Sequence, residues 1–345
     1  MIKRKTFPVF IVLLFAFAFL MPVAAGLISG GTDLAAIPFG VESIAKEDGE
    51  NTVLSSRIIR VYDCRTDSVA EHDFEEYMVG VLAGEMPASY ESEALKAQAV
   101  AGRSYILDRM ENYRKNGTPP EHKGADICND SAHCKAWLSM ESACEKWGEN
   151  WAEKYLPKLQ TAVRETRGEY MVYEGQTVKA FFYSASSGRT ETAHDVWGGN
   201  DYPYLQSVES VGDTTAPDFE STVTVTKIDF VQKLQSKNNA VIVSEPLSSM
   251  IGEVTRTEGG SVAAVVLGGQ LFKGTEIRTI FGLRSANFTI DAQDDDIVFH
   301  VKGYGHGVGM SQYGANYMAK QGKTYREILQ HYYTGIDFSM LNYQN

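Results

Sequence analysis

The stretch from residue 75 to residue 105 constrains the fold of this chain more than any other. Apolar residues between 75 and 83 recur at the spacing of a short helix with one buried face. Pro87 then moves Met86 out of helical geometry, and Ser89 can cap a second helix. The sequence therefore predicts two helices joined by an elbow, and the second helix is long enough to be a core element.

Glu85 is the acidic residue of this elbow, expected just past the end of the first helix. Beside Met86, Pro87 and Tyr90 its carboxyl group loses part of its hydration, which disfavours the charged form and raises the pKa. A carboxyl group of raised pKa can protonate a leaving oxygen at neutral pH. Most glutamates in loops are solvated, so this residue alone does not establish an active site.

Two glycine-containing loops are further candidates for ligand contact. The first, 183–190, follows two strand-like runs that are joined by a tight turn at Glu174 and Gly175. The second places glycines at alternate positions around His306, and such a bare backbone allows a ligand to approach closely. It contains no Gly-Lys-Ser or Gly-Lys-Thr, so a phosphate loop is not expected. On the residues alone, both loops are also compatible with plain turns.

Composition excludes one class of partner. The chain has 44 acidic and 32 basic residues and a net charge of −12, whereas sequence-independent binding to nucleic acid needs clustered Lys and Arg. With 345 residues and 43% hydrophobic content, it can bury a large core. We therefore expect a folded protein that binds no nucleic acid.

The N-terminal segment predicts export. Basic residues 3–5 precede an apolar run that reaches residue 28, so the basic end should stay in the cytoplasm and the rest cross the membrane. We expect a membrane anchor of one transmembrane helix at 1–28, a flexible linker at 29–51 and an extracytoplasmic domain at 52–345. Residues 24–26 are also compatible with signal-peptide cleavage.

Four cysteines in an exported chain permit disulfides, at positions 64, 128, 134 and 144. A metal site is the alternative, because His122, Cys128 and Cys134 stand six residues apart in a segment without strong periodicity. His133 could complete the ligand set. The spacing by itself leaves zinc and disulfide open.

Three separated blocks resemble the signature of the stage II sporulation protein D family of cell-wall lytic enzymes. They are Gly84-Glu85-Met86-Pro87 with the run 93–101, then 305–315, and then 331–335. The resemblance covers roughly residues 53 to 338 and is weakest from 208 to 260. It implies that Glu85 is the catalytic acid.

The resemblance also implies a binding surface and a metal. Relatives of the family bind zinc through His-x5-Cys-x5-Cys, which His122, Cys128 and Cys134 reproduce, and we expect the Zn²⁺ to support the loop beside Glu85. The residues expected to contact substrate are Arg103, Tyr183, Ser184, Ser186, Ser187, Gly188, His306, Ser311 and Gln312.

The implied activity is that of a peptidoglycan lytic transglycosylase. One acid would protonate the oxygen between N-acetylmuramic acid and N-acetylglucosamine in strands lacking stem peptides, and the muramic 6-hydroxyl would close onto C1 as a 1,6-anhydro product. Ordinary glycosidases pair two carboxylates, and the sequence offers a single convincing one. The family further implies septal wall degradation and engulfment during endospore formation, with stage II sporulation proteins P and M as partners, at the mother-cell membrane facing the forespore septum.

Two other functions stay open. The chain could be a non-catalytic cell-wall module like the amidase-enhancer proteins of the wider family, or a zinc-dependent wall amidase built on His122 and the cysteines. For the fold, we expect an α+β protein with a helical N-terminal half packed against a β-rich C-terminal half and the active-site cleft between them.

Overall fold

The computed structural model describes residues 58–130, 133–148, 150–199, 202–217 and 219–343. Both the predicted anchor at 1–28 and the predicted linker at 29–51 lie outside these residues. Within the described ranges, none of the helices combines the length and the apolar character needed to cross a membrane. The described chain is an α+β protein, as the sequence predicts.

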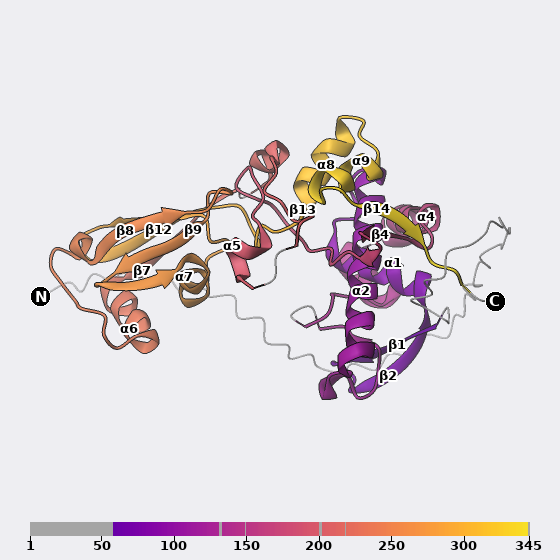
Figure 1. The fold of residues 1–345 in the computed structure, drawn as a ribbon, viewed down its shortest axis with the longest axis horizontal. Helices are drawn as coiled ribbons and strands as arrows, with labels where there is room; N and C mark the ends of the chain where they lie inside the picture. The colour runs from indigo at the N-terminus through magenta and orange to yellow at the C-terminus, as the bar shows by residue number, and fades with distance from the viewer. Residues whose placement is uncertain (1–57, 131–132, 149, 200–201, 218, 344–345) are drawn as a thin grey trace, which may run out of the picture. The chain divides into compact units, whose positions relative to one another are not determined.

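The larger hydrophobic core is built by helices from both ends of the described chain. Helices α1, α2, α4, α8 and α9 span Phe74–Glu85, Ser92–Asn116, Leu156–Glu165, Gln312–Lys320 and Tyr325–Tyr332. Helix α2 contacts each of the other four, and α8 and α9 lie near one of its ends (Figure 1). Small buried residues such as Ala94, Ala97 and Ala101 allow these close approaches. The C-terminal helices thus pack against the N-terminal ones, rather than standing apart from them.

The β-rich part, residues 220–302, is inserted between two segments that build this larger core. Strands β7 (Glu220–Thr226), β8 (Ile251–Arg256), β9 (Val262–Leu267), β10 (Gln270–Lys273), β11 (Phe288–Ala292) and β12 (Asp296–Lys302) form two antiparallel sheets, in the orders β11-β12-β7 and β10-β9-β8. Helices α6 (Lys227–Lys237) and α7 (Gly274–Phe281) complete it (Figure 1). Alternating burial along β12 supplies Phe299 and Val301 to a separate core that includes Phe230.

Short strands bring the two candidate loops together. Strands β4 (Glu169–Tyr173), β5 (Gln176–Thr177) and β14 (Asp337–Met340) form one sheet, and β6 (Phe182–Tyr183) pairs in parallel with β13 (Met310–Ser311). The predicted tight turn is confirmed, because Glu174 and Gly175 have positive φ values of 49° and 77°. The β6–β13 pair sets the loop after residue 183 beside the glycine-rich run.

The elbow differs from the prediction at both of its ends. Helix α1 includes Glu85 as its last residue, so this side chain is on the helix and not beyond it. Met86 is extended, with φ −127° and ψ 142°, as a residue before proline should be. Helix α2 begins after Glu91, so Ser89 does not cap it.

A third difference lies between α2 and α4. The four-residue recurrence of Trp147, Trp151, Tyr155, Leu159 and Val163 predicts one helix. This is confirmed from Trp151 onwards, where the chain is continuously helical to Glu165, whereas Trp147 ends a separate helix. The chain forms η1 (Pro120–His122), β3 (Ile127–Cys128), α3 (Met140–Trp147) and the π-helical turn η2 (Trp151–Tyr155) before α4 begins. Gly148, with φ 67°, ends α3, because this left-handed conformation suits glycine and stops the helix.

Candidate functional site

Glu85 occupies the C-terminal end of α1 with its carboxyl group half-buried. Its Oε1 accepts a hydrogen bond from the backbone amide of Ala136 at 3.0 Å. Burial raises the pKa of the Glu85 carboxyl, and the charge of Lys135, the Ala136 amide and the charge of Lys146 offset only part of that rise. Glu85 therefore has the environment expected of a proton donor.

Gln312 fixes the backbone of the elbow. Its Nε2 donates to the carbonyl oxygen of Glu85 at 2.9 Å and to Oε1 of Gln98 at 3.2 Å. Gln312 opens α8 and is buried, so this side chain ties α8 to the end of α1. Its predicted contact with substrate is replaced by a positioning role, since both amide hydrogens of a glutamine are used by these two bonds.

Arg103 is the clearest correction among the expected substrate contacts. Its side chain is 0% exposed, donates to both carboxylate oxygens of Glu75 at 3.2 and 2.7 Å, and donates to the Glu169 carbonyl at 2.8 Å. It belongs to the face of α2 that packs on α1 and β4. A guanidinium enclosed in this way joins core elements and cannot touch a glycan.

A buried carboxylate joins the two candidate loops. Asp213, in η3 (Val211–Thr215), accepts from the Ser186 amide at 2.7 Å and from the Ser186 hydroxyl through Oδ2, and from the Ser311 hydroxyl at 2.5 Å through Oδ1. Asp213 is fully buried, and burial raises the pKa of its carboxyl. Ser186 and Ser311 are buried as well, so they hold the loops and do not face a ligand. No sequence motif marks Asp213.

His306 is held as a neutral ring. Its Nδ1 accepts from the Val308 amide at 3.1 Å, which places the ring proton on Nε2. Burial, with Lys135 and Arg278 nearby, lowers the pKa of His306 to about 3. The ring packs against Tyr183, with centroids 5.4 Å apart, and Tyr183 is itself buried. Of the two residues, His306 lines the hollow between the loops and carries no charge at neutral pH, whereas Tyr183 supports its ring from within the core.

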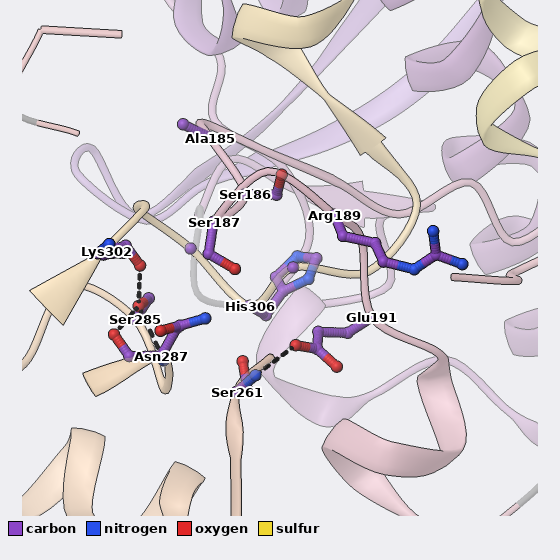
Figure 2. A pocket seen from close by; sticks show the side chains of 12 residues that line it. Ala185, Ser186, Ser187, Arg189, Glu191, Ser261, Ser285, Asn287, Lys302 and His306 are labelled. Atoms are coloured by element: carbon purple, nitrogen blue, oxygen red, sulfur yellow. Dashed lines mark hydrogen bonds between the residues drawn. The ribbon is translucent and has the colours of Figure 1, made fainter. Parts of the chain in front are cut away.

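The hollow between the loops is small and polar (Figure 2). It holds about 10 Å³, room for one water molecule, and is lined by Ser187, His306 and Glu191 among others. The Ser187 hydroxyl donates to the Gly259 carbonyl at 3.1 Å, and Oε1 of Glu191 accepts from the Ser261 amide at 3.0 Å. A sugar ring does not fit here. The two hydrogen bonds across the hollow anchor the loops to the β-rich part.

The remaining predicted contacts lie on the same loop. Ser184 is half-buried, and its carbonyl accepts from the Tyr313 amide at 3.0 Å. Gly188 has φ 108°, a conformation that other residues rarely adopt, and its carbonyl accepts from the Ser210 amide at 2.9 Å. Thus both residues fasten the loop through their backbones.

An aromatic cluster that no sequence pattern indicates lies beside His306. Phe181 precedes β6, Trp197 ends α5 (Ala193–Trp197), and Tyr202 follows shortly after. The ring centroid of Trp197 is 4.6 Å from that of Phe181 and 5.1 Å from that of His306. The residue after Phe181 is close to Lys135, whose Nζ lies 3.7 Å from the centroid of Phe182. The cluster is thereby continuous with the surroundings of Glu85.

Four side chains meet in the segment after α2. The ligand atoms of His122, Cys128, His133 and Cys134 lie within 4.8 Å of one another. Nε2 of His122 is 3.1 Å from Nδ1 of His133, and Sγ of Cys134 is 3.4 Å from that Nε2. A tetrahedral zinc with two imidazole and two thiolate ligands requires separations of about 3.3 to 3.8 Å. The four side chains therefore suit Zn²⁺ by donor chemistry, and their ligand atoms lie close to the spacing that a bound ion needs.

The cysteines form no disulfide. All four are free thiols, and Cys64 and Cys144 are exposed while Cys128 and Cys134 are buried. His133, which the sequence left as an optional ligand, completes the set. Cys134 is followed by Lys135 and Ala136, the two residues that act on Glu85, so the candidate metal loop and the candidate acid are adjacent.

Comparisons with a family model and with individual proteins point to the same family. Residues 62–173 match the family model SpoIID, stage II sporulation protein. The chain is 37% identical over 340 residues to stage II sporulation protein D of Bacillus subtilis (strain 168), covering 94% of this chain and 95% of that protein. It is 39% identical over 282 residues to stage II sporulation protein D of Bacillus amyloliquefaciens, covering 81% and 78%. It is also 27% identical over 314 residues to the amidase enhancer of Bacillus subtilis (strain 168), covering 74% and 39%.

Proposed function

This chain belongs to the stage II sporulation protein D family and is a sporulation protein, and we propose that it is a lytic transglycosylase of the bacterial cell wall. Its substrate would be glycan strands of peptidoglycan that lack stem peptides, cleaved between N-acetylmuramic acid and N-acetylglucosamine. The observation that carries this proposal is the carboxyl group of Glu85, which is half-buried, has a raised pKa and is oriented by the Ala136 amide.

Glu85 serves first as acid and then as base. Its proton passes to the glycosidic oxygen as the bond from C1 breaks, and the resulting carboxylate removes the proton of the muramic 6-hydroxyl while that oxygen bonds to C1. The net change is one bond broken and one ring closed, with the proton of the 6-hydroxyl restoring the acid. Between the two steps the charges of Lys135 and Lys146 stabilise the carboxylate.

The other carboxylates of the candidate loops support internal attack over attack by water. A hydrolase needs a second carboxylate that can reach a water molecule at the sugar. Asp213 and Glu191 are 0% and 2% exposed, and each accepts a hydrogen bond from a backbone amide of a fixed loop. Neither can approach the anomeric carbon, so the 6-hydroxyl remains the nucleophile.

Zinc would be structural in this proposal. His122, Cys128, His133 and Cys134 would hold it, and four protein ligands leave no open position for water or substrate. When bound, the ion would order the segment that delivers Lys135 and the Ala136 amide to Glu85. A closed site also disfavours a zinc-dependent amidase, which requires a coordination position for the reacting water.

Family membership supports the cellular setting. We infer that residues 1–28 anchor the chain in the mother-cell membrane, that 29–51 form a linker, and that the domain 52–345 faces the forespore septum and degrades its wall during engulfment. Stage II sporulation proteins P and M are the proposed partners, with protein P removing stem peptides first.

The test is mass spectrometry of products from defined glycan strands without stem peptides. The wild-type protein alone should release 1,6-anhydro-muramic ends, and Glu85→Gln should release none, because an amide cannot donate the proton. The matched control is Glu91→Gln, an exposed glutamate of the same elbow whose side chain does not cap α2. Equal release by Glu85→Gln would refute the proposal. No release by the wild type would instead favour a non-catalytic wall module.

A further inference from the structure

Trp197 presents an unusual amount of apolar surface. Its side chain is 47% exposed, although tryptophan is among the residues that proteins bury most on average. It ends a short helix, α5, and the glycines that follow it leave its outer face uncovered by their own side chains. An exposed indole beside a candidate active site offers a flat surface on which a ligand can stack.

The indole is held in place by what lies beneath it. It packs on Phe181 and on His306, whose ring is fixed by the hydrogen bond from the Val308 amide. The Thr192 side chain caps α5 by accepting from the Asp195 amide at 3.1 Å. A flat apolar surface held in this way loses little freedom when a ligand stacks on it.

The indole of Trp197 is connected to Glu85 through neighbouring side chains. Tyr105 lies 5.9 Å from Phe181 by ring centroids, and Nζ of Lys135 lies 4.1 Å from the Tyr105 centroid. Lys135 acts electrostatically on both Glu85 and His306. Trp197 and Glu85 are therefore linked through Phe181, Tyr105 and Lys135.

A second cation, Lys179, lies beside Phe181, the ring on which Trp197 packs. Nζ of Lys179 lies 5.6 Å from the Phe181 centroid and 5.7 Å from the Tyr202 centroid. A muramic acid that has lost its stem peptide carries a free lactyl carboxylate, whereas N-acetylglucosamine carries no charge. The combination of a stacking surface and an ammonium group matches such a sugar in both shape and charge.

We propose that Trp197 forms a remote glycan subsite, on which one sugar ring stacks while Lys179 pairs with the lactyl carboxylate of a peptide-free muramic acid. The subsite rests on the proposed function and extends it to substrate selection. Stacking on Trp197 supplies affinity for any amino-sugar polymer, and Lys179 supplies preference for strands from which the peptides have been removed.

The experiment measures binding by the full chain carrying Glu85→Gln, which cannot turn substrate over. Peptide-free glycan strands and neutral chitin oligosaccharides are titrated calorimetrically. Adding Trp197→Ala should weaken binding of both ligands on the order of tenfold, and Trp197→Phe should retain part of the affinity. Adding Lys179→Gln should weaken binding of peptide-free strands alone and reduce its dependence on salt. Leu271→Ala, which removes an exposed leucine of β10, is the matched control and should bind as the parent does.

Two outcomes separate this inference from the proposed function. If Trp197→Ala, with an unchanged circular dichroism spectrum, binds both ligands as tightly as the parent, the subsite does not exist while the transglycosylase proposal stands. If Lys179→Gln weakens chitin as much as peptide-free strands, the selective role of the ammonium group is wrong. If the Glu85→Gln parent binds no glycan at all, the subsite and the proposed function are overturned together.

Discussion

The backbone amide of Ala136 donates a hydrogen bond to Oε1 of Glu85, although 51 residues separate the two in sequence. Ala136 lies two residues after Cys134, one of the four clustered metal-ligand side chains. The bond orients a carboxyl group whose pKa is raised by burial. The segment that would bind zinc therefore also fixes the direction in which the acid points.

Removing the metal should disturb this contact. Treatment with a chelator, or Cys134→Ser, should abolish stoichiometric zinc and lower the melting temperature by several degrees, because metal binding contributes to the stability of the ordered segment. Metal analysis and thermal unfolding measure both effects. Cys144→Ser, at an exposed cysteine outside the cluster, is the control and should change neither. A zinc content that survives Cys134→Ser would contradict the assigned ligand set.

The pH dependence of cleavage should follow the proton of Glu85. The reaction needs the protonated acid, so activity should fall as pH rises through the raised pKa of this carboxyl. Lys146 favours the ionised form, and Lys146→Met should raise the pKa further and move the basic limb of the kcat profile to higher pH. Lys154→Met, at an exposed lysine of η2, should leave the limb in place. A shift to lower pH would have the wrong sign for this assignment.

Asp213 should control both stability and the alignment of the substrate loops. Asp213→Asn cannot accept from Ser186 and Ser311 through two carboxylate oxygens, and the unpaired buried donor should cost about 1 to 3 kcal/mol of unfolding free energy. Because the loops would still exist but fit the glycan less well, KM should rise more than kcat falls. Chemical unfolding and steady-state kinetics provide the two measurements. Asp229→Asn, at an exposed aspartate of α6, is the comparison variant and should leave KM unchanged.

Arg103 should contribute to the stability of the fold and make no contact with the glycan. Arg103→Met leaves Glu75 buried with the Gly168 amide and the Tyr343 hydroxyl as partners but no cation, which should cost about 3 to 5 kcal/mol of unfolding free energy. Arg164→Met, at an exposed arginine of α4, should cost far less. A stable Arg103→Met variant with weakened glycan binding would restore the direct contact that the sequence predicts.

Several local features were predictable because they depend on neighbouring residues. Pro87 sets the extended conformation of Met86 and ends α1 close to Glu85. Glu174 and Gly175 form the turn that their residue types predict. Strand-like runs at 222–226, 263–267 and 297–301 predict strands, and β7, β9 and β12 lie there. The repeated spacing of His122, Cys128 and Cys134 likewise indicated three residues that do cluster.

Other features depended on contacts between distant parts of the chain. The sequence assigned Arg103 to substrate binding, but α1 and β4 enclose its guanidinium. It also gave Ser186 and Ser311 to the substrate, whereas Asp213 binds both. Such errors arise because periodicity describes one helix or loop at a time, and burial is decided by what packs against it.

By itself, the sequence determined the family, the elbow that carries Glu85 and the positions of the main strands, because short-range sterics and the local pattern of apolar residues decide these. Only the tertiary structure decided which side chains surround Glu85 and which polar residues are buried and hydrogen-bonded inside the protein. The bond from Gln312 to the Glu85 carbonyl spans 227 positions of the chain. A contact of that kind forms only when the helices of the core pack together, and no local preference encodes it.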